Sequence, residues 1–211
     1  RAIVDRHRDD RPGAQTALRT LRRRELLRAA LASALGLDDV LATGERLTGI
    51  AAVAIDAALD LVASDVAVGV VSMGRTGGRE IGFGSDVDVL WACRDESELD
   101  AATRAVRAVS EVVQDPFVRL DLDAGLRPEG RQGPLVRTIA SYAAYYERWG
   151  EVWERQALLR AAPFAGDGAV GEALLEVLAR VRDAGGLSTA DAREIRRIKA
   201  RVDAERLPRG A

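Results

Sequence analysis

The chain has 211 residues and 47% of them are hydrophobic, enough to build the core of one large domain or of one domain with an appendage. Its 31 basic and 33 acidic residues nearly cancel, which argues against a nucleic-acid partner, because such a partner needs a basic footprint. Cys93 is the only cysteine, which excludes an internal disulfide and favours the cytoplasm. No apolar run approaches the ~20 residues of a membrane span, so no membrane partner is expected.

The sequence lacks the residues that several classes of catalytic site require. His7 is the only histidine and lies in a polar segment, so His-based catalysis and His-rich metal sites are not expected. The chain contains neither the G-x-x-x-x-G-K-[ST] phosphate loop nor the protein-kinase signatures. It starts at Arg1 and stops after LPRGA without a helix end, which predicts a piece of a longer protein.

Hydrophobic periodicity divides the chain into helices and strands. Apolar residues at helical spacing predict helices, and continuous or alternating apolar residues predict strands. In chain order the sequence predicts a polar lead-in over 1–14, helices over 15–35, 39–42 and 45–63, strands over 66–73 and 86–93, a helix over 96–113, a strand over 117–123, a loop over 124–134, helices over 138–148 and 151–162, a helix from 167 or 168 to 182, a linker over 183–186 and a helix over 190–205.

Caps and faces follow from the same pattern. Asp38, Asp95 and Ser188 stand where they are predicted to cap the helices that begin after them. The inward positions of the first two long helices include Leu27, Leu31, Leu35 and Val53. The opposite face of the first helix is interpreted as a solvated face or as a face that binds phosphate or a partner, and it holds Arg19, Arg22, Arg23, Arg24 and Arg28.

Two features surround the second strand. Gly74, Gly77 and Gly78 form a turn that can present backbone N–H groups to phosphate, although a turn of this kind more often only reverses the chain. Asp86 and Asp88 are two residues apart, so in a strand they share one face, roughly 6.6 Å apart. The alternatives for this pair are a metal site and a solvated edge-strand face.

Other residues extend this candidate site. A neighbouring third strand would bring Asp123 to the same metal ions, and Asp121 is a further acid with no assigned role. Arg75 and Arg127 are candidates to neutralise a triphosphate, the alternative for the loop arginine being a solvated surface charge. The aromatic residues of 138–162 are interpreted as core, with a ring that contacts adenine as the alternative.

Carboxylates without His or Cys favour hard ions such as Mg²⁺. A pair of such ions about 3.5–4 Å apart can clamp the attacking and leaving oxygens of a phosphoryl displacement. The layout therefore predicts a nucleotidyltransferase that uses ATP, with attack at the α-phosphorus and pyrophosphate as the leaving group. In this hypothesis Asp86 and Asp88 bridge both ions, and Asp123 completes one of them or accepts the proton of the attacking hydroxyl.

Three blocks carry a family resemblance: MGRTGGREIGFGSDVDVLW, LDAGLRPEGRQGPLVRTIASYAAYYERWGEVWERQALLRA and RIKARVDAERLPRG. They resemble the glutamine synthetase adenylyltransferase family, a bifunctional family whose two homologous halves adenylylate and deadenylylate a tyrosine of glutamine synthetase. The segments GFGSDVDVL, SYAAYYERW and ERLPRG are similar to the C-terminal, adenylylating half of high-G+C bacterial members.

The resemblance implies an α+β fold with a polymerase-β-like nucleotidyltransferase core and a small mixed or antiparallel sheet. It implies a core with N-terminal helices over 15–136 and the start of a helical domain over 137–211. Glutamine synthetase would be the protein substrate, a PII-type regulatory protein would act through the full-length chain, and nitrogen metabolism would be the setting.

The resemblance also assigns the site. It places the paired metal ligands at Asp86 and Asp88 and the third at Asp123, in both catalytic and metal-binding roles. Its glycine turn falls on Gly74, Gly77 and Gly78, and the arginine of its loop motif falls on Arg127. With Arg75 and Ser85, these are the residues predicted to bind the nucleotide. Gly125 departs from the family, in which many members have Arg, and Leu122 replaces the usual Val.

The residues leave other activities open. One is the reverse-direction half, which converts adenylyl-tyrosine to ADP by phosphorolysis. Another is a non-catalytic nucleotide-sensing module, which the cluster of three acids disfavours. A small-molecule adenylyltransferase is disfavoured only by the resemblance.

Overall fold

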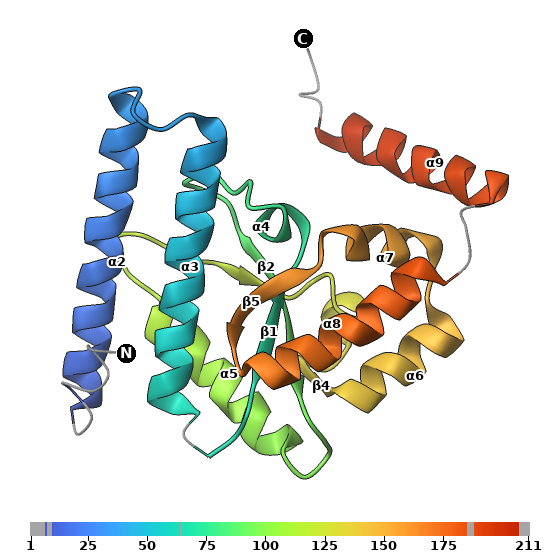
Figure 1. Ribbon diagram of the computed structural model, residues 1–211, viewed down its shortest axis with the longest axis horizontal. Coiled ribbons are helices and arrows are strands. Elements are labelled where there is room, and N and C mark those ends of the chain that lie inside the picture. The colour runs from blue at the N-terminus through green and yellow to red at the C-terminus, as the bar shows by residue number, and fades with distance from the viewer. Residues whose placement is uncertain (1–6, 8–9, 64, 185–187, 207–211) are drawn as a thin grey trace.

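The computed structural model describes residues 7, 10–63, 65–184 and 188–206. It is an α+β protein in which a small mixed sheet lies between layers of helices (Figure 1). The strands are β1 (Gly69–Ser72), β2 (Val87–Cys93), β3 (Leu122–Asp123), β4 (Val136–Thr138) and β5 (Ala162–Gly166). Their order is β3-β2-β1-β5, and β4 also pairs with β2. β1 runs antiparallel to β2 and β5, whereas β3 and β4 run parallel to β2.

The helices before β4 are α2 (Arg11–Ala34), α3 (Val40–Val62), α4 (Gly74–Gly77), α5 (Leu99–Val113) and the short 3-10 helix η1 (Gly130–Gln132). Those after it are α6 (Ile139–Trp149), α7 (Val152–Ala157), the 3-10 helix η2 (Leu158–Arg160), α8 (Gly168–Asp183) and α9 (Thr189–Arg206). None of the helices in the described ranges is both long and apolar enough to cross a membrane.

Alternation along the central strands divides the core between two faces. Val87, Val89 and Trp91 belong to the cluster that α3 and α5 complete, and Leu90 and Ala92 belong to the cluster that α6 and α8 complete. Successive strand side chains point to opposite faces, so each strand is covered on both sides. The first predicted strand, β1, is central in the sheet, and so is β2.

The N-terminal helices differ from the prediction at their ends. α2 begins at Arg11, because the Asp10 carboxylate accepts the Gly13 N–H at 3.0 Å, so the predicted lead-in is too long. The predicted short helix and the turn after it are wrong, because α3 is one helix over these residues. Asp39 caps α3 by accepting the Ala42 N–H at 2.8 Å, whereas Asp38 pairs with Arg46.

The predicted inward face of α2 is wrong in its second half. Leu27, Leu31 and Leu35 are 60%, 52% and 72% exposed, and Val53 of α3 is 59% exposed. α2 is the outermost helix of its layer and lies against α3 and the end of α5, so it has no neighbour on these positions (Figure 1). Arg22, which was assigned to the opposite face, is only 5% exposed.

Two strand predictions also need correction. The third strand contains only Leu122–Asp123, because the carbonyls of Val118 and Arg119 bond to the Arg22 side chain instead of to a strand. The predicted helix over 151–162 ends early, and β5 follows it. Pro163 lies in β5 at the edge of the sheet, where a missing N–H is tolerated.

Of the other two predicted helix caps, the one at Asp95 is wrong and the one at Ser188 is confirmed. Asp95 does not cap α5, because its carboxylate bonds to Ser97 in a turn before the helix. Ser188 accepts the Asp191 N–H at 3.1 Å, as predicted for the start of α9. Residues 185–186 of the predicted linker and 207–210 of the third resemblance block lie outside the described residues.

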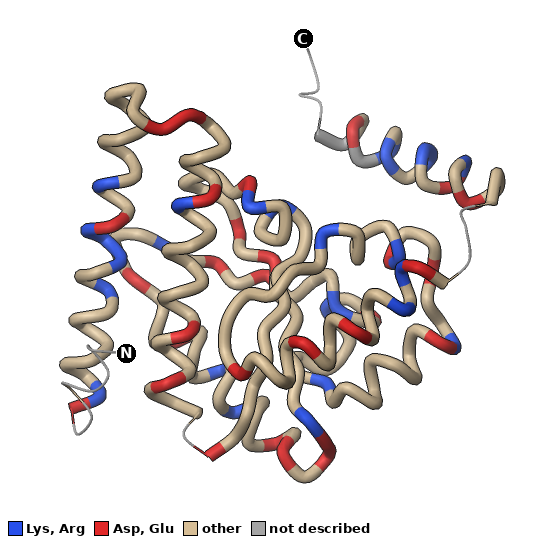
Figure 2. The backbone as a smooth tube through the Cα atoms, in the orientation of Figure 1, with Lys and Arg blue, Asp and Glu red and all other residues tan. Residues whose placement is uncertain are grey.

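The predicted domain boundary falls within β4. β5 and the helices α6 and α8, which come after it, complete the same sheet and one of its two core clusters. α9 lies apart from the sheet and carries charges of both signs along its length (Figure 2).

Candidate active site

The start of β2 places Asp86 and Asp88 at the edge of the core. Val87 between them is fully buried on the α3 and α5 side, so the two carboxylates share the opposite side, as predicted. The Asp88 N–H donates to the Thr76 hydroxyl at 3.0 Å. Thr76 is 1% exposed, so this bond fixes α4 against the strand from inside.

β3 brings the third acid to this place. In the parallel pairing of β2 with β3, Asp123 stands opposite Asp88. The pKa of Asp88 is raised, first by its burial and then by the negative charge of Asp123, with a smaller contribution from Asp86. Arg75 opposes this shift through its charge and its backbone N–H. The residues that were predicted separately therefore interact electrostatically.

The Asp123 side chain is held by the loop after it. Its Oδ1 accepts the Gly125 N–H at 2.7 Å. A Cβ at position 125 would lie 2.9 Å from that oxygen, so a larger residue requires the carboxylate to move. The glycine that departs from the family is thus compatible with an Asp123 carboxylate folded back on its own loop.

The glycine turn meets Asp88 at Gly74. Gly74 has a φ of +52°, and a Cβ there would lie 2.5 Å from Asp88 Oδ2. The N–H groups of Gly77 and Gly78 donate to the carbonyls of Met73 and Gly74, so they are engaged within the turn. Packing requires glycine at position 77, since a Cβ added there would lie 1.7 Å from the Arg160 carbonyl oxygen.

The remaining predicted nucleotide contacts lie in loops. Ser85 accepts the Gly82 N–H at 2.8 Å and closes the turn that leads to Asp86. The Arg127 guanidinium donates to the carbonyls of Ala124, Arg131 and Gly133 at 2.8–3.1 Å, so it holds its own loop. A phosphate contact by this arginine would have to share or replace those bonds.

The donors at this place are all oxygens, which suits a hard divalent cation. Gly74 leaves room beside Asp88 Oδ2 that a side chain would fill. However, no group of three acidic, His or Cys side chains within the described ranges is arranged so that it could hold a metal ion. The oxygen donors of Asp86, Asp88 and Asp123 are of the type that Mg²⁺ prefers, but as arranged here they do not form a metal site, so binding a cation would require these side chains to move.

The predicted aromatic core is confirmed for two rings. Tyr142 is fully buried and donates to the Trp91 carbonyl at 3.2 Å, and Tyr146 is 6% exposed. Trp149 is 61% exposed and does not belong to the core.

Sequence reasoning missed Thr76 and the role of Arg22. Thr76 gave a weak signal, as the only hydroxyl residue within the run of turn glycines. Arg22 gave none, because the carbonyls it binds are 91 to 97 residues away in the chain.

The fold and this site define an α+β domain in which paired strands carry coupled carboxylates beside a glycine turn. Residues 1–177 match the protein family described as Glutamate-ammonia ligase adenylyltransferase, and the chain belongs to that family. Its relatives include proteins named "Bifunctional glutamine synthetase adenylyltransferase/adenylyl-removing enzyme" from Mycobacterium avium, at 49% identity over 92% of the chain, and from Mycolicibacterium smegmatis, at 48% over 94%. The relative of that name from Nocardia farcinica is 47% identical over 96% of the chain. The chain spans about a fifth of the length of these relatives, 22% in each case.

Proposed function

We propose that this chain is a Mg²⁺-dependent nucleotidyltransferase that moves AMP from ATP to a tyrosine hydroxyl of glutamine synthetase. The observation that carries the proposal is the pairing of Asp123 with Asp88 across two parallel strands, beside Gly74 and Arg75. The names of the relatives supply the acceptor protein and the transferred group. Adenylylation would inhibit glutamine synthetase as part of nitrogen regulation in the cytoplasm, with a PII-type protein acting through the full-length chain.

In this proposal the chain's own residues prepare the reacting groups. Asp86, Asp88 and Asp123 would hold the cation, which when bound would lower the pKa of a coordinated hydroxyl and offset phosphate charge. Thr76 holds the backbone of Asp88, and the lack of a side chain at Gly74 leaves room for the Asp88 carboxylate to turn toward the cation. Arg75 supplies positive charge on the same side. Asp123 is also placed to accept the proton of the attacking hydroxyl.

The direction of transfer is part of the proposal. The resemblance of GFGSDVDVL and SYAAYYERW to the C-terminal half supports adenylylation rather than removal of AMP. Incubation with unmodified and with adenylylated glutamine synthetase, in the presence of ATP or of phosphate, separates the two activities. Release of ADP without AMP incorporation would replace our choice with the deadenylylating half.

The roles of the acids are tested with labelled ATP and glutamine synthetase. Asp88→Asn and Asp123→Asn should each abolish incorporation of labelled AMP and leave the circular dichroism spectrum unchanged. Asp121→Asn is the matched control, because Asp121 is an exposed neighbouring acid to which we assign no role, and it should keep wild-type activity. ATP binding without turnover by the wild-type protein would favour a sensing module instead.

A further inference from the structure

The segment between α5 and β3 is held without a strand partner. Residues 118–121 precede Asp123, yet only their last carbonyl bonds to the backbone of the sheet, accepting the Val87 N–H at 2.8 Å. A backbone carbonyl that is shielded from water needs a donor, and the part-buried carbonyls of Val118, Arg119 and Leu120 have none from the backbone of the sheet. Side chains supply the donors: Arg22 bonds to the first two carbonyls and Gln114 to that of Leu120 at 3.3 Å.

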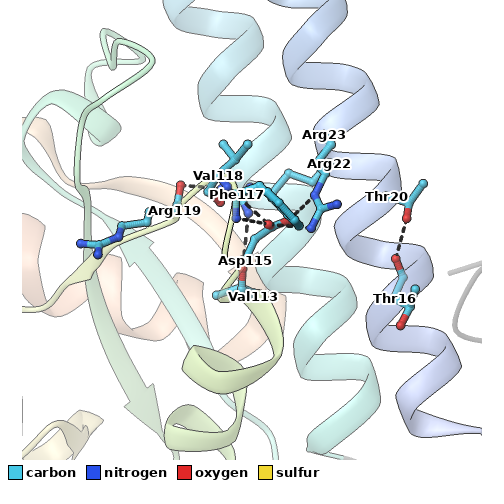
Figure 3. A network of polar contacts seen from close by, with 9 residues as sticks. All are labelled: Thr16, Thr20, Arg22, Arg23, Val113, Asp115, Phe117, Val118 and Arg119. Atoms are coloured by element: carbon cyan, nitrogen blue, oxygen red, sulfur yellow. Dashed lines mark hydrogen bonds and ion pairs between the residues drawn. The ribbon is translucent and has the colours of Figure 1, made fainter.

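Arg22 makes the shortest of these bonds. Its Nη2 donates to the Val118 carbonyl at 2.7 Å and to the Arg119 carbonyl at 2.6 Å, and its Nη1 donates to the Val113 carbonyl at 3.4 Å (Figure 3). The residue is 5% exposed, and burial lowers the pKa of its guanidinium. A buried cation is costly unless its donors are used. A helix that only packed at this position would use an apolar residue.

Asp115 fixes the start of the same segment. Its carboxylate accepts the Phe117 N–H at 2.8 Å and two bonds from Arg23 at 2.6 and 2.7 Å. The Arg23 guanidinium also lies 4.6 Å from the centre of the Phe117 ring (Figure 3). Neighbouring positions on α2 thus hold the chain from Asp115 to Arg119, which leads into the residues before Asp123.

We propose that Arg22 is a positioning residue for nucleotidyl transfer, because it sets where β3 places Asp123 opposite Asp88. This inference rests on the proposed function. β3 is two residues long, so its own pairing offers little to fix its position. Arg119 stands four positions before Asp123, about 13 Å of extended chain. Arg22 Nη2 donates to the carbonyls of both Val118 and Arg119, Gln114 donates to that of Leu120, and the Val87 N–H donates to that of Asp121. Loss of the Arg22 guanidinium removes the donor of the first two carbonyls and releases the segment that determines where Asp123 stands.

The test compares single variants in the full-length protein. Arg22→Gln should lower kcat by ~100-fold with little change in the KM for ATP, since small displacements of a reacting group have effects of this size. Arg22→Lys should restore part of the lost kcat. Gln114→Ala, at an exposed position, should lower kcat several-fold by releasing the Leu120 carbonyl, with its fold checked by circular dichroism. Arg19→Gln is the control, because Arg19 of the same helix donates to the Glu111 carbonyl of α5 and not to the segment before Asp123, and it should keep wild-type kcat.

Hydrogen exchange adds a readout that a general loss of stability would not give. Exchange of the Val87 N–H should accelerate in Arg22→Gln, while the N–H groups of α8 stay protected. Wild-type kcat in both Arg22→Gln and Gln114→Ala, together with an inactive Asp123→Asn, would overturn the positioning role alone. Full activity of Asp123→Asn would instead overturn the proposed function. Uniform acceleration of exchange with kcat unchanged per folded molecule would assign Arg22 to stability only.

Discussion

At the scale of single residues, Gly74 connects the glycine turn to the carboxylate of Asp88. Its φ of +52° is costly for other residues, by roughly 1–2 kcal/mol, and a Cβ would push on Asp88 Oδ2 at 2.5 Å. Gly74→Ala should therefore lower the free energy of unfolding by about that amount and lower kcat by ~10-fold or more. Gly49→Ala is the control: this helical glycine has no neighbour within 4 Å, so the protein should gain up to ~1 kcal/mol and keep its activity. Urea unfolding and labelled AMP transfer measure both effects, and an unchanged Gly74→Ala would contradict this role.

Asp115 makes a pH-dependent contribution to stability. Bonds from Arg23 lower the pKa of its carboxyl from 3.8 to about 2, and the charged side chains that act on it are Arg22 and Arg23. A folded pKa below the unfolded one stabilises the protein above pH ~4, and this stabilisation is lost as the pH falls from ~4 to ~2. Asp115→Asn should cost about 2 kcal/mol at pH 7, and the difference from wild type should shrink within that window. A difference that stays constant between pH 7 and pH 2 would contradict the assignment.

At the scale of elements, α2 is anchored by its first half and by its arginines. Leu18 is 4% exposed against the core, whereas Leu31 is 52% exposed. Leu18→Ala should cost about 2–5 kcal/mol, and Leu31→Gln should change the free energy of unfolding by less than ~0.5 kcal/mol. Equal losses of stability in Leu18→Ala and Leu31→Gln, measured by thermal unfolding, would contradict this account, because they would show that α2 is buried along its whole length.

At the scale of the whole molecule, the sheet depends on residues beyond the predicted boundary at 136. β5 completes the sheet beside β1, and α8 completes the core cluster to which Val71 and Leu90 belong, whereas α9 lies apart from the sheet (Figure 1). A chain that ends after Asp183 should lose less than ~1 kcal/mol, since an ion pair such as Arg155–Asp191 contributes little. A chain that ends after Arg137 should fail to unfold cooperatively in urea. Cooperative unfolding of the shorter chain would contradict this account.

Local patterns predicted much of this molecule. Alternation placed Val87 in the core and Asp86 and Asp88 on one face, and Asp123 on a strand beside them. The strand β5 escaped prediction because Pro163 and Gly166 within a five-residue stretch are typical of a break between helices, and only the sheet edge makes Pro163 acceptable in a strand. Arg22 escaped because an arginine on an amphipathic helix normally faces water, and its partners come from a segment distant in sequence. Both features depend on contacts between segments that are distant in the sequence, and hydrophobic periodicity along the chain does not reveal such contacts.

The most direct test of the central claim is a structure of the protein with a non-hydrolysable ATP analogue and Mg²⁺. We predict that the Asp86, Asp88 and Asp123 carboxylates turn toward bound metal, with the α-phosphate beside them and the triphosphate on the side of Arg75. Metal and triphosphate bound away from these carboxylates would contradict the account.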